Sequence, residues 1–269
     1  MGEIGEAPAV GRPDVVYIVR PGENNQQLRY SLRALSNLPH GRVWIVGYRP
    51  AWVSEEVGYI PTQQAKPKHA NTWGNWRAAA QCDQIADEFI LFNDDFFITR
   101  PIEKVEPLHA GLLTERMAKY RRFRLTEYVE RATYTQRMLR QAGLDADRAL
   151  SYELHVPFPV NRVRLLEGIK RLDGMLRRPI EAVSKRTYYG NTVGLGGTLA
   201  RDVKVKRNTD GMPETPLPYL STSPQSWEGL AGGWVRAQFP DVCRYERSAV
   251  SARPAARRTY RPGGAHARR

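Results

Sequence analysis

The chain contains only two cysteines, Cys82 and Cys243, and no long apolar run. Two cysteines this far apart do not make a disulfide framework, and a structural zinc site would lack its other ligands. No apolar stretch approaches the roughly 18 residues that a membrane-spanning helix requires. The first residues are acidic rather than apolar, unlike a secretory signal. These absences predict a cytoplasmic protein with reduced thiols and no membrane span.

Two widespread catalytic motifs are missing as well. The chain has neither the phosphate-binding glycine loop of P-loop proteins nor the G-x-S-x-G turn that carries the nucleophile of many hydrolases. Its composition is that of a globular protein, with 41% hydrophobic and 10% aromatic residues, and 269 residues can bury a proper core. Function therefore has to be sought in other patterns.

Negative charge is scarce in two parts of the chain, and the net charge is +13 with a pI near 10.0. Residues 247–269 hold seven arginines, no lysine and no acid. A second basic cluster comprises Arg116, Lys119, Arg121, Arg122 and Arg124. Basic clusters favour a polyanionic partner such as nucleic acid. A coding bias towards arginine explains them equally well, so both interpretations stay open.

Short apolar runs alternate with helical periodicity through the first hundred residues. The runs 14–19, 43–46, 57–60 and 89–92 predict buried strands. The apolar spacing of 25–37 and 72–84 predicts helices between them. Alternating strands and helices indicate an α/β fold of Rossmann type, with a mostly parallel sheet and helices on both faces.

The remainder of the chain has a different pattern. Helical periodicity returns in 115–142, 160–172 and 227–239, the last with Ser226 as its expected cap. Pro157 and Pro159 make 151–159 extended, and a strand is expected within 199–205. We therefore expect four parts: a flexible N-terminus (1–13), an α/β core (14–107), a partly helical remainder (108–246) and a flexible basic tail (247–269).

Two adjacent carboxylates, Asp94 and Asp95, follow the apolar run 89–92. At the end of a buried strand they repel each other and lose hydration, so a compensating charge is required. A divalent cation is the usual one, and it can bridge to phosphates. Because ligands of open α/β sheets bind at the carboxyl ends of the strands, the pattern predicts a metal that holds a nucleotide diphosphate. The alternative is a turn in which these side chains cap backbone groups.

Within this motif Asp95 is the expected direct metal ligand. Asp94 is expected to bind one of three partners: the ribose, a water bound to the metal, or the metal itself. Asn93 can donate and accept at once, which suits a sugar hydroxyl. The loop after the first strand contains Arg20 and Asn24, and it lies where the base and ribose of a nucleotide would dock. An ordinary polar turn is the alternative for this loop.

Three further side chains are candidates for binding or catalysis. Arg29, on the helix after the first strand, either reaches phosphates or faces solvent. His155 lies in the proline-stiffened segment and is a candidate metal ligand or acid–base group, although a lone histidine is more often structural. Arg186, beside two tyrosines and a glycine-rich loop, indicates either acceptor binding or a packed corner.

Several blocks resemble, in order, the Stealth-type sugar-phosphate transferases and the short phage-type glycosyltransferases similar to them. The blocks are 28–33 (LRYSLR), 50–52 (PAW), 71–72 (NT) placed 22 residues before Asn93, 89–97 (FILFNDDFF), 155–159 (HVPFP), 239–240 (FP) and 244–246 (RYE). The resemblance covers about residues 14–160 well and the rest loosely.

The resemblance implies a GT-A-like fold, a divalent metal (Mn²⁺ or Mg²⁺) and a nucleotide-sugar donor bound by 14–107. It suggests metal or catalytic roles for Asp94, Asp95 and His155, and it places Asn71 and Arg29 near the donor. The first block of the family ends in W-V-D-G where this chain has VRPG at 19–22, and the long spacer of the larger members is missing. These departures favour plain glycosyl transfer over sugar-1-phosphate transfer.

We therefore expect a metal-dependent glycosyltransferase whose acceptor hydroxyl is bound by 108–246. The basic surface favours DNA with hydroxylated bases as acceptor, contacted by Arg121, Arg122 and Arg186, with the enzyme in the host cytoplasm if it is phage-encoded. A phage protein or a cell-wall glycan is the alternative acceptor. The competing functions are sugar-1-phosphate transfer and non-catalytic nucleic-acid binding, and the paired carboxylates weigh against the latter.

Overall fold

A computed structural model describes residues 11–64 and 67–247 of the chain. The expected flexible N-terminus (1–13) and basic tail (247–269) lie almost entirely outside these residues. Within the described part, no helix combines the length and the apolar character that crossing a bilayer requires.

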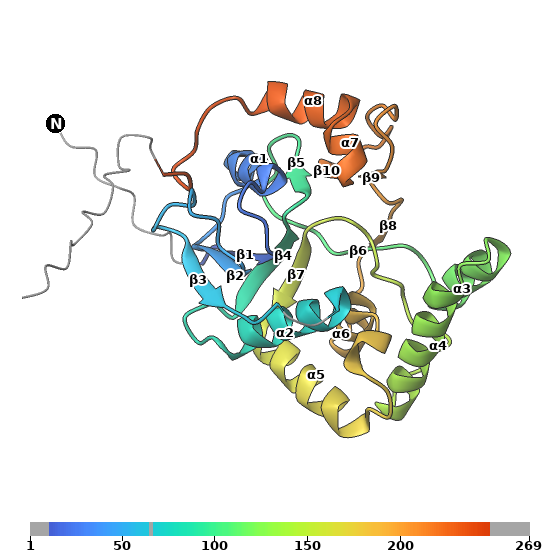
Figure 1. The fold of residues 1–269 in the computed structure, drawn as a ribbon. Helices are drawn as coiled ribbons and strands as arrows, with labels where there is room; N and C mark the ends of the chain where they lie inside the picture. Colours follow the sequence, from blue (N-terminus) through green and yellow to red (C-terminus); the bar gives the residue numbers. More distant parts are fainter. Residues whose placement is uncertain (1–10, 65–66, 248–269) are drawn as a thin grey trace, which may run out of the picture.

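Strands and helices alternate in the first part of the chain, and helices dominate afterwards (Figure 1). The strands are β1 (Asp14–Val19), β2 (Val43–Gly47), β3 (Gly58–Pro61), β4 (Glu88–Asn93), β5 (Phe96–Ile98), β6 (Leu108–His109), β7 (Phe158–Asn161), β8 (Thr198–Leu199), β9 (Lys204–Val205) and β10 (Tyr219–Thr222). The helices are α1 (Gln26–Ala34), α2 (Lys68–Gln81), α3 (Leu113–Arg122), α4 (Thr126–Gln141), α5 (Arg162–Met175), α6 (Lys185–Thr192), α7 (Pro224–Trp227) and α8 (Leu230–Gln238).

The central sheet has the strand order β3-β2-β1-β4-β7. The first four strands are parallel, and the edge strand β7 runs antiparallel to β4, so the expected mostly parallel sheet is confirmed. All six residues of β1 and all five of β2 are buried, as strands covered on both faces require. Three further strands pair in the order β5-β10-β9, and β6 pairs with β8.

Alternate residues of the central strands enter two separate cores. Val16 packs with apolar side chains of α2, α4, α5 and α6, whereas Tyr17 packs with those of α1 on the opposite face. Figure 1 shows the same division, with α1 on one side of the sheet and α2 and α5 on the other. At the start of α1 the side chain of Asn25 accepts from the backbone N–H of Leu28, which caps the helix.

The ranges expected as core (14–107) and remainder (108–246) share one sheet and the same packing. β4 pairs with β7, and β5 pairs with β10. Trp76 of α2 lies against Phe158 of β7, with ring centroids 6.3 Å apart. Residues from both ranges therefore build the surroundings of the strand ends.

Several elements differ from the sequence-based expectation. The helix expected over 115–142 is two helices, because the chain turns between α3 and α4, where Arg124 has a φ of 54°. The helix expected over 227–239 is the short α7 followed by α8. Ser223 caps α7, and Ser226 is its partner in a capping box rather than the cap itself. The strand expected within 199–205 is divided between β8 and β9.

Candidate active site

The strand order creates a switch point between β1 and β4. After β1 the chain adds β2 and β3 on one side, and then places β4 on the other side of β1. In open α/β sheets, ligands bind outside the carboxyl ends of the strands at such a point. Arg20 follows the carboxyl end of β1, and Asp94 and Asp95 follow that of β4, where they form the turn into β5. The fold thus brings these three predicted residues to one edge of the sheet.

Asp94 is buried and faces the residues that follow β1. Its Oδ2 accepts a hydrogen bond from Nδ2 of Asn25 at 2.8 Å and lies 3.8 Å from Nε of Arg20. Burial raises the pKa of Asp94 above its ordinary value, and the charge of Asp95 raises it further, while Asn25 and Arg20 act in the opposite direction. A buried carboxylate with this kind of perturbation marks a candidate functional site.

Asp95 is paired with a cation that no sequence pattern indicated. Its Oδ2 accepts from the ammonium group of Lys204 and from the hydroxyl of Ser221, the latter at 3.1 Å. Lys204 lies in β9 and Ser221 in β10, and the pairing of β10 with β5 brings both to the turn after β4. The partners of Asp95 are therefore distant side chains, unlike those expected for a simple turn-capping motif.

His155 lies in the segment that enters β7, and a carboxylate holds its ring. Nδ1 of His155 lies 2.8 Å from Oδ2 of Asp202, whose Oδ1 accepts from the backbone N–H of His155 at 2.9 Å. Burial acts to raise the pKa of Asp202, but the hydrogen bonds and charge of His155 outweigh it and leave this pKa below its ordinary value. With Nδ1 engaged, Nε2 is the ring atom that can exchange a proton with a substrate.

The histidine and the carboxylate pair share one edge of the sheet. Because β7 runs antiparallel to β4, with Phe158 opposite Leu91, the chain enters β7 where β4 ends. Arg186 of α6 ties this segment down, since its Nη1 donates to the carbonyl oxygens of Leu154 and Val156 at 2.8 and 2.7 Å. These two bonds flank His155 and fix the backbone that carries it.

Arg186 also carries a buried positive charge that interacts with three carboxylates, those of Glu153, Asp95 and Asp202. Burial lowers its pKa to about 10, and the charges of Glu153, Asp95 and Asp202 counter this effect. The guanidinium group therefore stays protonated at neutral pH. Its Nη2 is buried and has no hydrogen-bond partner among the described residues, and the residue is 7% exposed. The structure thus buries Arg186 and ties it to the His155 segment, and its acceptor role stays a prediction.

The predicted donor loop is at this edge, but a different asparagine faces the carboxylates. Asn24 is exposed and accepts a hydrogen bond from Gln26. Asn25, the next residue, donates to Asp94. Asn93 is the last residue of β4 and lies directly before the carboxylate pair.

Arg29 and Asn71 have contacts elsewhere. Nη1 of Arg29 lies 3.1 Å from a carboxylate oxygen of Glu246, and its guanidinium group lies over the ring of Trp52, 4.5 Å from the centroid. Asn71 lies in the first turn of α2 and donates to the carbonyl oxygen of Gln64 at 3.2 Å. The donor-binding roles of both residues stay predictions.

Arg121 and Arg122 are exposed in the last turn of α3. None of the contacts described for residues 11–64 and 67–247 links them to Asp94, Asp95 or His155. Their acceptor role also stays a prediction.

The chemistry of the carboxylate pair fits a Mg²⁺ or Mn²⁺ ion that binds together with a diphosphate. Such an ion keeps several waters and needs only one or two protein carboxylates beside phosphate oxygens. The contacts above use Oδ2 of each carboxylate and leave the two Oδ1 atoms out. In the described part of the chain, no three His, Cys, Asp or Glu side chains are grouped to hold an ion. His155 is therefore not part of a ready-made ligand set with Asp94 and Asp95, and its metal role stays a prediction.

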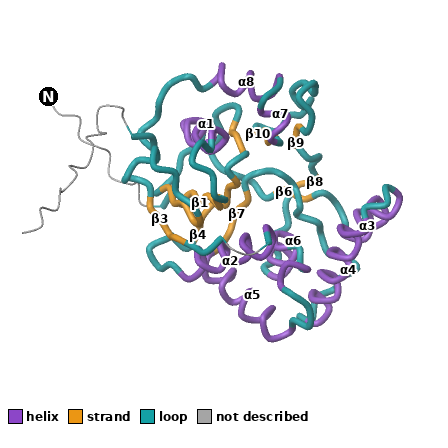
Figure 2. The backbone as a smooth tube through the Cα atoms, in the orientation of Figure 1, coloured by secondary structure: helices purple, strands orange, loops and turns teal. Residues whose placement is uncertain are grey.

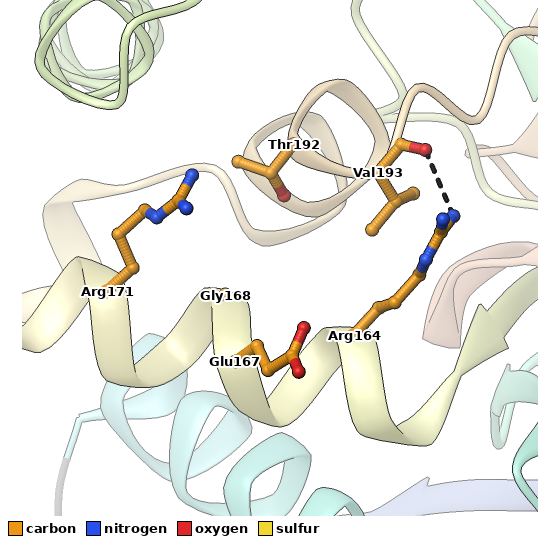
Figure 3. A pocket seen from close by; sticks show the side chains of 6 residues that line it. All are labelled: Arg164, Glu167, Gly168, Arg171, Thr192 and Val193. Carbon is orange, nitrogen blue, oxygen red and sulfur yellow. Dashed lines mark hydrogen bonds between the residues drawn. The ribbon is translucent and has the colours of Figure 1, made fainter.

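A cavity of about 180 Å³ lies at a different place, between α5 and the end of α6 (Figure 3). Arg164 and Arg171 of α5 extend towards Thr192 and Val193, and Arg164 donates to the carbonyl oxygen of Val193 at 3.4 Å. α5 begins directly after β7, whose last residue pairs with the first residue of β4. This cavity therefore lies towards the edge of the sheet opposite the carboxylates.

No family model matches this chain, and no curated protein matches its sequence. The resemblance to Stealth-type transferases consequently rests on the sequence blocks alone, and the functional argument rests on the site.

Proposed function

We propose that this protein is a glycosyltransferase of GT-A type that moves a sugar from a nucleotide-sugar donor to a hydroxyl acceptor. One observation carries the proposal. Asp94 and Asp95 are buried at the carboxyl end of β4, beside the switch point, with Arg20 and Asn25 of the neighbouring loop against Asp94. Carboxylates at this position suit a metal-bound diphosphate, and the polar loop after β1 suits the ribose and base.

The carboxylate pair positions the leaving group in this proposal. Asp94 and Asp95 would hold a divalent metal, and such an ion would supply positive charge to the diphosphate as it leaves. Lys204 adds a fixed positive charge beside Asp95, and Arg20, 3.8 Å from Asp94 at the end of β1, would contact the nucleotide.

The His155–Asp202 pair activates the acceptor. Nε2 of His155 takes the proton of the acceptor hydroxyl, while Asp202 holds the ring at Nδ1 and stabilises the imidazolium. The hydroxyl oxygen bonds to the anomeric carbon, the bond between that carbon and the diphosphate breaks, and the nucleoside diphosphate leaves. Arg186 keeps the segment of His155 in position through its two carbonyl contacts.

Calorimetric titration with a panel of nucleoside diphosphates, with and without Mn²⁺, tests the donor site. We expect metal-dependent binding of one nucleotide, and loss of that binding in Asp94→Ala and Asp95→Ala. Asp83→Ala is the matched control, because Asp83 is an exposed carboxylate ahead of β4, at the opposite edge of the sheet. Absence of binding by every nucleotide, or equal binding by Asp95→Ala, would refute the proposal.

The released nucleotide separates the two transferase reactions. Glycosyl transfer releases the nucleoside diphosphate, whereas sugar-1-phosphate transfer releases the monophosphate and forms a phosphodiester. A DNA acceptor predicts binding that weakens steeply with salt, and a neutral glycan does not. A non-catalytic nucleic-acid-binding module predicts that Asp94→Ala and Asp95→Ala retain full DNA affinity and that no sugar is transferred.

A further inference from the structure

The turn between α3 and α4 concentrates exposed apolar surface. Phe123 is 58% exposed, Leu125 41% and Tyr128 52%. The other large apolar side chains that are exposed in the described residues lie far apart along the chain: Tyr59, Val163, Leu199, Met212, Leu230 and Val242. Single exposed apolar residues are normal for a protein surface, but three within six residues, in the turn and the start of α4, indicate a contact surface.

The same turn is strongly basic. Lys119, Arg121, Arg122 and Arg124 are all exposed, and the acid within residues 119–128, Glu127, is paired with Arg131. Arg124 has a φ of 54°, in the left-handed region that a non-glycine residue rarely adopts. These four cations therefore flank Phe123 and Leu125 in the sequence, and Arg124 lies at the point where the chain reverses.

The turn is ordered by its own contacts and lies at the margin of the molecule. The backbone N–H of Leu125 donates to the carbonyl of Tyr120 at 2.9 Å, and the N–H of Tyr128 donates to the carbonyl of Leu125 at 3.1 Å. The rings of Tyr120 and Tyr128 contact each other, with centroids 5.4 Å apart. Figures 1 and 2 show α3 and α4 joined by this short turn, away from the central sheet.

We propose that residues 119–128 form a docking tip that binds the surface of an anionic lipid membrane. This inference goes beyond the proposed glycosyl transfer and does not depend on it. Phe123 and Leu125 enter the apolar part of the lipid layer, tyrosine suits its boundary with water, and the flanking cations pair with lipid phosphates. Charge complementarity and the apolar apex together select this partner.

Nucleic acid would share the phosphate chemistry but fits the apex less well. Bases bind on aromatic faces, but the rings of Tyr120 and Tyr128 are in contact with each other, and the guanidinium group of Arg122 lies over the ring of Phe123, 5.9 Å from its centroid. Leu125 offers no face for stacking, yet it is exposed at the apex beside Phe123.

Vesicle flotation of the full chain provides the test. The probes are vesicles of phosphatidylcholine alone and vesicles in which part of it is replaced by phosphatidylglycerol. We expect binding only to the anionic vesicles. Phe123→Ser combined with Leu125→Ser should weaken it roughly tenfold or more, because the inserted apolar groups are lost. Arg121→Glu combined with Arg122→Glu should weaken it by roughly 25-fold or more, at about fivefold for each cation lost.

Matched variants separate the tip from the rest of the basic chain. Leu230→Ser with Val242→Ser removes two apolar side chains elsewhere that are even more exposed than those of the tip. Arg177→Glu with Arg178→Glu reverses two exposed charges outside the tip. Every variant keeps the arginines of 248–269, so a loss confined to the tip variants reports on the tip. Thermal unfolding confirms that each variant is folded.

Three outcomes would overturn the proposal. The first is equal binding to vesicles with and without phosphatidylglycerol. The second is unchanged vesicle binding by the Phe123→Ser, Leu125→Ser variant. The third is a tip variant that loses affinity for a fluorescent oligonucleotide, or loses self-association, while its vesicle binding is unchanged.

Discussion

Lys204 and Asp95 lie 109 residues apart in the chain, and the ammonium group of one donates directly to the carboxylate of the other. Their side chains are 17% and 12% exposed, so the pair is largely withdrawn from water. The chain itself therefore supplies a cationic partner for Asp95. Asp94 instead accepts a hydrogen bond from the amide of Asn25 at 2.8 Å and lies 3.8 Å from the guanidinium group of Arg20. The two neighbouring carboxylates therefore have different partners. Burial and the charge of Asp95 raise the pKa of Asp94, so the fold opposes the ionisation of Asp94.

Lys204→Met should destabilise the protein by about 2 kcal/mol, because Asp95 then keeps a buried charge with Ser221 as its remaining described partner. Urea unfolding measures this change, and Lys206→Met, on an exposed lysine two residues away, is the control. A double-mutant cycle with Asp95→Asn isolates the pair, since the loss should be smaller once the carboxylate is neutral. Equal urea midpoints for Lys204→Met and Lys206→Met would show that the pair contributes nothing.

Asp94→Asn should separate stability from binding. Burial and the charge of Asp95 raise the pKa of Asp94 in the folded state, so the ionised carboxylate opposes folding at neutral pH. The asparagine keeps the size and an acceptor oxygen for Asn25 but carries no charge. We expect a higher urea midpoint than wild type at neutral pH, together with loss of metal-dependent nucleotide binding.

The pH dependence of this difference gives an independent check. As the pH falls through the raised folded-state pKa, wild-type Asp94 becomes protonated and the advantage of the variant shrinks. It should disappear below about pH 3.9, the ordinary pKa of aspartate, where the carboxyl is neutral in both states. A variant that is less stable than wild type at neutral pH would contradict the assignment of Asp94 as an unfavourable buried charge.

The sequence predicts those parts of the fold and site that a local pattern marks. Continuous apolar runs predict β1, β2 and β4, and the acids directly after β4 predict its turn. Lys204 and Asp202 carry no such mark, because the first lies in a two-residue strand and the second in a loop. Their partners are set by the pairing of β10 with β5 and by the path into β7, which are long-range contacts.

The sequence also does not predict which residue of a loop faces the site, or how deeply a side chain is buried. The sequence indicates a polar loop after β1, but the start of α1 decides that Asn25, rather than Asn24, faces Asp94. For Arg186 the sequence leaves acceptor binding and a packed corner equally open. In the fold its helix packs beside the His155 segment, and burial makes it part of the framework of the site.

His155→Gln should reduce the turnover number by roughly 10²–10⁴-fold, as loss of a general base does, while leaving the affinity for the nucleotide unchanged. Asp202→Asn should lower turnover less than His155→Gln does, because the ring then loses the carboxylate that holds Nδ1 but keeps Nε2 as the base. Steady-state kinetics, with calorimetry for the nucleotide, provides the measurement. Asp210→Asn, on a carboxylate paired with Arg207, is the control. Wild-type turnover in His155→Gln would remove this residue from the chemistry.

Glu246, near the end of the described chain, forms ion pairs with two arginines of α1. Its carboxylate accepts from Arg33 at 2.7 and 3.1 Å and lies 3.1 Å from Nη1 of Arg29. The side chain of Glu246 is 2% exposed. Glu246→Gln should therefore lower the free energy of unfolding by about 3 kcal/mol, because two arginines lose a buried counter-charge. Glu55→Gln, which affects an exposed pair with Arg247, should cost little and is the control.

Arg29→Met decides between a structural role and a donor-binding role for Arg29. If Arg29 serves only Glu246 and the ring of Trp52, the variant unfolds at lower urea but binds the nucleotide with wild-type affinity under conditions where it is folded. If Arg29 also reaches a phosphate, as the resemblance to Stealth-type transferases implies, the dissociation constant should rise roughly tenfold for one lost charge-assisted hydrogen bond. The contacts of Arg29 favour the first result, because its described partners are Glu246 and Trp52 rather than the carboxylates after β4.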